Sequence, residues 1–210
     1  MEQLKPEKQS GWRGSADLWV SAAYQALVDG GVDAVRVMPI AKALGLSRTS
    51  FYWHFEDRDA LLAAIVALWE DKNTGNLIAK TEVAADGINA AMFNLFDCWI
   101  DAEKFDSRLD HAIRNWAQND ASVRVRVDAA DGRRFAAVKA MFERFGYAPD
   151  QATTRAWTVL YTQVGYISMM VSEPVAKRID RMPAYVEVFT GVAPDAEEIA
   201  VFRARHGLPA

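Results

Sequence analysis

Cysteine is nearly absent from the 210-residue chain, which contains only Cys98. A single thiol excludes an intramolecular disulfide and a zinc site built from cysteines. Histidine is also scarce, and His54, His111 and His206 are too scattered to form a His-Glu-x-x-His metal motif. The sequence has no Gly-x-Ser-x-Gly, no Walker loop and no Gly-x-Gly-x-x-Gly. It therefore predicts neither an enzyme nor a bound metal or cofactor.

Long apolar runs are missing as well. Charged residues or prolines interrupt every stretch that approaches the roughly 20 apolar residues needed to cross a bilayer. The first residues, Met1 to Arg13, are polar and lack the apolar segment of a signal peptide. These features predict a cytoplasmic protein that does not contact a membrane. No β-alternating segment of useful length occurs either.

Helical periodicity runs through most of the chain, and 51% of its residues are hydrophobic, enough to build a core. Glycine and proline pairs such as Gly146 with Pro149 separate the periodic segments. The prediction is an all-α protein, with a small helix-turn-helix domain over residues 12–58 and a larger helical domain over residues 59–206. Its helices are expected at 16–29, 38–44, 58–72, 86–104, 107–118, 121–145, 150–172, 174–189 and 195–205.

Residues 40–55 are the most informative stretch. Ile40, Ala41 and Leu44 form an apolar stripe on one helix. Gly45 follows at the point where the helix ends and a positive φ is needed, a conformation that glycine adopts without steric cost. This order is typical of the first helix and the turn of a helix-turn-helix motif.

A second short helix begins after Ser47, whose side chain is placed to cap it by accepting from the amide of Ser50, worth about 1 kcal/mol. Phe51 and Phe55 are four residues apart and are expected to face inward. Asp57 is expected to cap the next helix. The remaining side chains of the second helix are cationic, hydroxylic or aromatic, which suits a helix that enters a DNA major groove.

The run from Gly45 to Leu62, with Tyr52-Trp53-His54-Phe55 at its centre, resembles the N-terminal domain of the TetR family of transcriptional regulators. The resemblance covers roughly residues 12–70. It implies an all-helical homodimer with a three-helix DNA-binding head and a ligand-sensing body. Family members usually carry Ser or Thr where this chain has Val37, so one expected phosphate contact is missing.

The resemblance and the residue chemistry together give a set of candidate DNA contacts. Arg48 opens the second helix, where an arginine can bind guanine O6 and N7 bidentately, although it could also be a solvated surface cation. Tyr52 and His54 match family positions that bind the DNA backbone, whereas Trp53 could instead pack under the connecting helix. Ser50 could simply be part of the cap. The full predicted set is Arg36, Lys42, Arg48, Thr49, Ser50, Tyr52, Trp53, His54 and Arg58.

Net charge argues against DNA binding only weakly. The chain carries a formal charge of −4, whereas many nucleic-acid-binding domains are basic. Residues 36–58, however, hold four basic side chains against two acidic ones. The predicted contact segment is therefore positive even though the whole chain is acidic.

The body is rich in aromatic side chains, which predicts either an apolar pocket for a small-molecule effector or an ordinary core. The candidate ligand residues are Phe96, Trp99, His111, Trp116 and Tyr161. His111 is also explained by a surface or interhelical salt bridge. The family resemblance places a homodimer interface on the helices near 150–189. Gly165 and Ala156 would permit close helix approach there, and an apolar seam could be lined by Val159, Tyr166 and Met170. The alternative is that the helix at 150–172 is the buried spine of a monomer.

These features predict a DNA-binding transcriptional regulator, specifically a ligand-responsive repressor that binds a pseudo-palindromic operator in double-stranded DNA as a dimer. The alternative is a helical protein that binds a small molecule or a partner without sequence-specific DNA binding. The sequence does not identify the effector.

Overall fold

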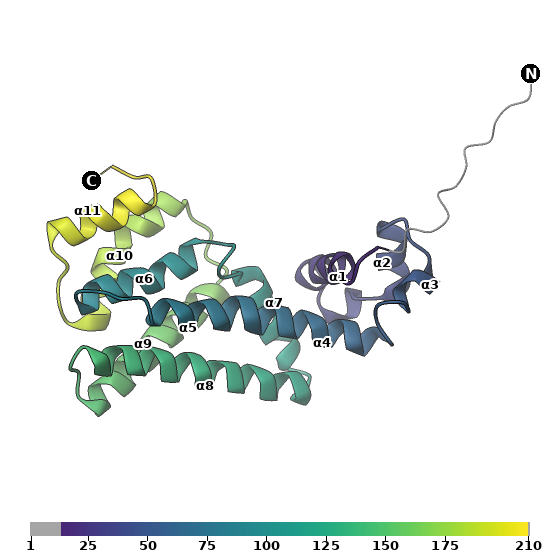
Figure 1. Ribbon diagram of the computed structural model, residues 1–210, viewed down its shortest axis with the longest axis horizontal. Helices are drawn as coiled ribbons and strands as arrows, with labels where there is room; N and C mark the ends of the chain where they lie inside the picture. Colours follow the sequence, from purple (N-terminus) through teal and green to yellow (C-terminus); the bar gives the residue numbers. More distant parts are fainter. Residues whose placement is uncertain (1–13, 210) are drawn as a thin grey trace, which may run out of the picture. The chain divides into compact units, whose positions relative to one another are not determined.

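The computed structural model describes residues 14–209, and these residues form helices without any strand (Figure 1). The all-α prediction is therefore confirmed. The predicted domain start at residue 12 and the polar segment Met1 to Arg13 lie outside the described residues. Within the described part, no helix is long and apolar enough to cross a membrane. The chain divides into two compact units between Ala67 and Leu68.

Unit 1 contains α1 (Ala16–Gly30), the single-turn helix η1 (Val32–Ala34), α2 (Val37–Ala43), α3 (Arg48–Phe51) and most of α4 (Arg58–Trp69). Ser15 caps α1 by accepting a hydrogen bond from the amide of Leu18 at 3.2 Å. Asp57 caps α4 in the same way, accepting from the amide of Ala60 at 2.8 Å. Short polar side chains before each helix satisfy amides that the helix itself leaves unpaired.

The core of unit 1 is built around two fully buried aromatic rings. Trp19 of α1 and Phe51 of α3 meet edge to face, with ring centroids 5.3 Å apart. Phe55 stacks on Phe51 at 5.6 Å and is half-buried. The inward orientation predicted for these two phenylalanines is thus confirmed. Aliphatic residues of α1, α2 and α4 complete the core, namely Leu27, Ile40, Leu61, Leu62 and Ile65.

Unit 2 continues α4 through the π-helical segment η2 (Glu70–Gly75) into α5 (Asn76–Thr81). The chain remains helical through residues 73–76, where Asn73 and Thr74 are buried and bonded to neighbouring parts of unit 2. The later helices begin and end within a few residues of the predicted ranges. They are α6 (Ile88–Ile100), α7 (Ser107–Ala117), α8 (Ala121–Arg144), α9 (Pro149–Ser168), α10 (Val175–Thr190) and α11 (Ala196–Arg205).

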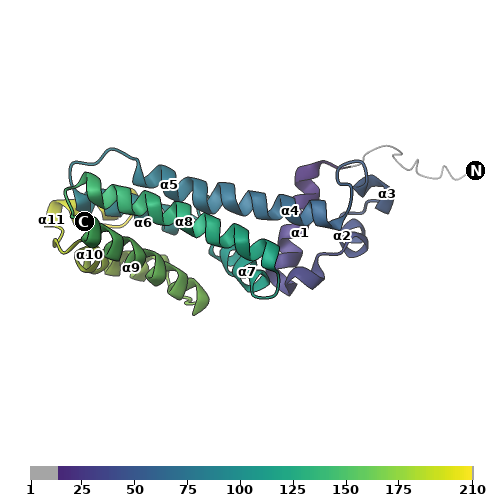
Figure 2. The same cartoon turned by 90° about the horizontal axis from the view of Figure 1, so that it is seen from below.

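The core of unit 2 lies between α6, α8, α9 and α10, and α8 runs alongside α9 (Figure 2). Ala156 and Val159 of α9 are fully buried in this core. They were predicted to face a partner subunit, and that prediction is wrong because the protein's own helices cover both side chains. Only the opposite face of α9, which carries Thr154, Thr158 and Tyr161, is exposed.

The two units separate later in the chain than the predicted boundary at 58/59. Arg58, the first residue of α4, donates to the carbonyl oxygens of Val35 at 2.6 Å and Val32 at 2.7 Å. These bonds fix the start of α4 to unit 1. The boundary therefore falls inside a continuous helix, where no turn or composition change marks it in the sequence.

Candidate DNA-binding surface and ligand cavities

The turn between α2 and α3 has the predicted geometry. Gly45 adopts φ +66°, and Leu46 then donates to the carbonyl of Ala41 at 2.9 Å to close the end of α2. Ser47 caps α3 by accepting from the amide of Ser50 at 3.1 Å. The glycine and the cap together fix the direction in which the short α3 leaves the turn.

The outer face of α3 presents a cation next to two aromatic rings. Arg48 and Thr49 are exposed, as are Tyr52 and Trp53, whose rings are 49% and 61% exposed. Arg48 Nη2 donates to the Tyr52 hydroxyl at 3.0 Å, with its guanidinium 5.6 Å from the centre of that ring. This contact holds a flexible arginine against α3. His54 is half-buried beside this face.

Two basic residues of the predicted set precede α3 in the sequence: Lys42 lies on α2, and Arg36 lies directly before α2. Arg36 and Lys42 are both exposed, and Arg36 Nε also donates to the carbonyl of Asp33 at 2.8 Å. They add positive charge on the same segment without being buried in the core. The structure thus gathers most of the predicted DNA contacts around α2 and α3.

Ser50 and Arg58 instead bond to other groups of unit 1, although the Arg58 side chain remains 38% exposed. Ser50 is buried, and its hydroxyl lies 3.0 Å from the hydroxyl of Ser47. Arg58 uses Nε and Nη2 on the backbone carbonyls of Val35 and Val32. The cap role of Ser50 was one of the two alternatives open from the sequence, whereas the role of Arg58 was not visible there, because the carbonyls lie more than twenty residues away from it. Both residues support the surface from within.

The same segment matches a family model. Residues 20–65, from α1 to α4, match the model described as bacterial regulatory proteins, tetR family. Unit 1 is a TetR-family DNA-binding domain. The chain accordingly carries an N-terminal helix-turn-helix domain of this family.

Solved structures resemble the fold of both units of the chain. One is a transcriptional regulator from Rhodococcus sp. Rha1, with 21% identity, coverage of 91% of this chain and 97% of the other, and a TM-score of 0.60. A TetR-family regulator from Mesorhizobium loti has 17% identity, coverage of 95% and 98%, and a TM-score of 0.57. The fatty acid degradation regulator FadR from Bacillus halodurans has 15% identity, coverage of 88% and 97%, and a TM-score of 0.63. No curated protein sequence matches the chain.

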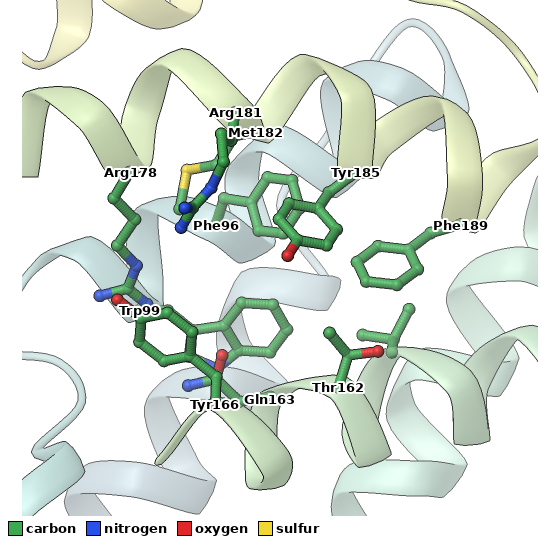
Figure 3. Close-up of a pocket in the computed structure, with 11 residues that line it drawn as sticks. Phe96, Trp99, Thr162, Gln163, Tyr166, Arg178, Arg181, Met182, Tyr185 and Phe189 are labelled. Carbon is green, nitrogen blue, oxygen red and sulfur yellow. The ribbon is translucent and has the colours of Figure 1, made fainter. Parts of the chain in front are cut away.

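Unit 2 has an aromatic cavity between α6, α9 and α10 (Figure 3). Two residues predicted as ligand contacts, Phe96 and Trp99, form part of its wall, and Tyr185 and Phe189 of α10 face them. Arg178 lies at one side with its guanidinium 4.8 Å from the centre of the Tyr166 ring. The free volume is about 50 Å³. That is far below the several hundred Å³ of typical ligand pockets.

A larger cavity of about 340 Å³ lies between α7, α8 and α9. This volume is within the range of small-molecule sites. Tyr161, also predicted as a ligand contact, lines it. Most of the remaining wall is apolar, but one side carries two arginines and two aspartates, namely Arg114, Arg134, Asp110 and Asp131.

His111 and Trp116 line neither of these cavities. The His111 ring is bonded to the side-chain amide of Asn115 at 2.8 Å, and Trp116 Nε1 donates to Asp120 at 3.0 Å. Each side chain therefore has a hydrogen-bond partner nearby in the sequence, within α7 for His111 and just after α7 for Trp116. We leave these two residues out of the proposed ligand site.

The ionic cluster beside the larger cavity was missed by the sequence analysis. Asp110 is fully buried and accepts from Arg114 Nε at 2.7 Å, from Trp69 Nε1 at 2.8 Å and from Arg134 Nη1 at 3.2 Å. Arg114 also forms a bidentate pair with Asp131, at 2.8 and 2.7 Å. The spacing of Asp110 and Arg114 along one helix was visible in the sequence. Their burial depends on the packing of α4, α7 and α8 against one another, and that packing was not visible in the sequence.

The cluster favours the ionised forms of Asp110 and Arg114. Burial alone would raise the pKa of Asp110, but the charges of Arg134 and Arg114 outweigh burial and lower it. Burial acts to lower the pKa of Arg114, and its bonds to Asp131 and Asp110 reverse that direction and raise it. Two buried cations and two anions thus stabilise one another in a wall that is otherwise apolar.

Proposed function

We propose that the chain is a ligand-responsive repressor that binds a pseudo-palindromic operator as a homodimer through the outer face of α3. The observation that carries this proposal is the pairing of Arg48 with Tyr52 on the exposed face of a helix fixed by Gly45 and the Ser47 cap. An arginine held in this way loses less side-chain freedom when it binds a base edge.

Each exposed residue around α3 has a proposed role. Arg48 and Thr49 contact base edges in the major groove, while Tyr52, Trp53 and His54 contact the backbone beside it. Arg36 and Lys42 neutralise phosphates. Ser50 and Arg58 have a positioning role, because their polar atoms hold the cap and the start of α4.

A homodimer would present two copies of α3 to DNA. Recognition helices about 34 Å apart read two half-sites one helical turn apart. The exposed faces of α9 and α10 are the proposed interface, since they carry apolar side chains in solvent, including Tyr161, Tyr185 and Val188. Burying such a patch against a second copy would stabilise the dimer.

Ligand control would act through the end of α4. Trp69, its last residue, donates to Asp110 in the wall of the 340 Å³ cavity. A ligand that binds one arrangement of this wall better than another shifts the position of α4, and DNA must then change ligand affinity by the same factor. We propose that ligand binding lowers operator affinity.

The proposed DNA binding can be tested without a known operator. The intact protein would be used to select duplexes from a random-sequence pool over several rounds, followed by sequencing of the bound fraction. We expect an enriched motif with two related half-sites. A pool that remains random after selection would contradict sequence-specific binding.

Replacing Arg48 by alanine is expected to relax specificity at particular base pairs of the selected motif. The free energy that discriminates the preferred base from the other bases should fall by about 1–3 kcal/mol at the base pair that Arg48 contacts and should change little at the other base pairs. Fluorescence anisotropy with single-base variants of the motif measures this pattern. Arg133→Ala, which removes an exposed arginine of α8 in unit 2, is the control. An equal loss on every duplex would instead make Arg48 a phosphate contact.

A further inference from the structure

Arg134 has one donor group without a partner. The side chain is 3% exposed, and its Nε donates to Thr74 at 2.9 Å while Nη1 donates to Asp110 at 3.2 Å. Nη2 is buried and has no hydrogen-bond acceptor among residues 14–209. An unpaired buried donor destabilises a structure, so such a group points to an acceptor that binds there.

The 340 Å³ cavity borders this arginine. Arg134 forms part of the wall, and most of the lining that α9 contributes is apolar, including Leu160 and Ile167, with Gln163 as a polar exception. Gly165 leaves further space in the same wall, since a Cβ built at this position meets no atom within 4 Å. The cavity therefore combines an apolar body with hydrogen-bond donors at one end, the usual arrangement of a small-molecule site.

The charges around the cavity decide which acceptor fits. Arg114 and Arg134 are balanced by Asp110 and Asp131, and the two carboxylates also lie in the wall. A ligand carboxylate would add a negative charge that no cation of this cluster is left to balance. A carbonyl oxygen accepts the same hydrogen bond without adding charge. A neutral acceptor is therefore favoured.

We propose that this cavity binds a compact, mostly apolar molecule with a neutral carbonyl oxygen, such as a cyclic ketone, lactone or amide, and that Arg134 Nη2 donates to that oxygen. The proposed binding of this molecule is argued from the cavity itself. The further claim that the molecule is the effector of repression rests on the proposed function. Arg134 also holds Thr74, and Asp110 holds Trp69, so an occupied cavity acts on both ends of the segment that joins α4 to α5.

The test is isothermal titration calorimetry of the intact protein with a panel of cyclic ketones, lactones and amides. Each compound is paired with its carboxylate and its carbonyl-free hydrocarbon analogue. We expect at least one neutral carbonyl compound to bind, and to bind at least tenfold more tightly than its carboxylate. If no carbonyl compound binds, or if only carboxylates bind, the proposal is overturned.

Two variants locate the site. Gly165→Leu fills the cavity without touching the ionic cluster and should weaken binding of the carbonyl compound at least tenfold. Gly132→Leu makes the same change on the exposed face of α8 and should leave binding unchanged. Arg134→Lys should weaken the binding of the carbonyl compound about tenfold and should leave the binding of its hydrocarbon analogue unchanged. Unchanged binding in Gly165→Leu would contradict the assignment even if Arg134→Lys does not fold. No DNA is present, so failure here is distinct from failure to bind an operator.

Discussion

Asp110→Asn is expected to lower the free energy of unfolding by about 3–5 kcal/mol, because removing one partner leaves buried charge uncompensated. Asp110 is the acceptor shared by Arg114, Arg134 and Trp69, and asparagine keeps its shape but not its charge. Denaturation by urea, followed by circular dichroism, measures the loss. The matched control is Asp128→Asn, which removes an exposed carboxylate paired with Arg124 on α8. The control should change stability by less than about 1 kcal/mol. Equal losses in the two variants would show that the cluster does not stabilise the body.

The same variant has an expected pH signature. The pKa of Asp110 is lowered in the folded protein, so its ionisation stabilises the fold at pH values above the ordinary aspartate pKa of about 4. That contribution is lost as the pH falls through the lowered folded-state pKa. The stability gap between the native protein and Asp110→Asn should therefore be constant near neutral pH and shrink in acid. A gap that widens below pH 4 would contradict this assignment.

The affinity for operator DNA is expected to fall about 10²-fold between 50 and 200 mM salt. Arg36 and Lys42 are exposed beside α3, so the proposed dimer presents about four cations to phosphates. Counterion release then gives a slope of about −4 in a plot of log affinity against log salt. Anisotropy titrations of the selected duplex at a series of salt concentrations measure this slope.

Variants separate the contributions to the slope. Lys42→Ala removes about two of the four cations from the dimer and should reduce the magnitude of the slope by about 2. Arg133→Ala, which removes an exposed arginine of α8, should leave the slope unchanged. A slope near zero for the native protein would mean that phosphate contacts do not drive binding, and an unchanged slope for Lys42→Ala would remove that residue from the surface.

The helix-turn-helix could be predicted from sequence because its signals are local. Gly45 requires a positive φ, Ser47 lies three residues before the amide it caps, and Phe51 and Phe55 lie one helical turn apart. Each of these relations spans at most four residues. Helix ends in the body were also predictable, because glycine and proline mark them.

Long-range packing was not predictable. The carbonyl partners of Arg58 are 23 and 26 residues away from it, and Asp110 meets Trp69 across 41 residues. No periodicity encodes such distances. The same limit explains why Val159 was expected at an interface although it is buried within its own subunit. Aromatic content alone could not distinguish residues that line a cavity, such as Trp99, from residues that hydrogen-bond to a neighbour in the sequence, such as Trp116.

Sequence-selective DNA binding is tested most directly by one paired titration. The intact protein is titrated by fluorescence anisotropy with the duplex obtained by selection and with a duplex of the same composition in shuffled order, at physiological salt. We predict that the selected duplex binds at least about 10³-fold more tightly. Equal affinity for the two duplexes would contradict the assignment of α3 as a sequence-reading helix.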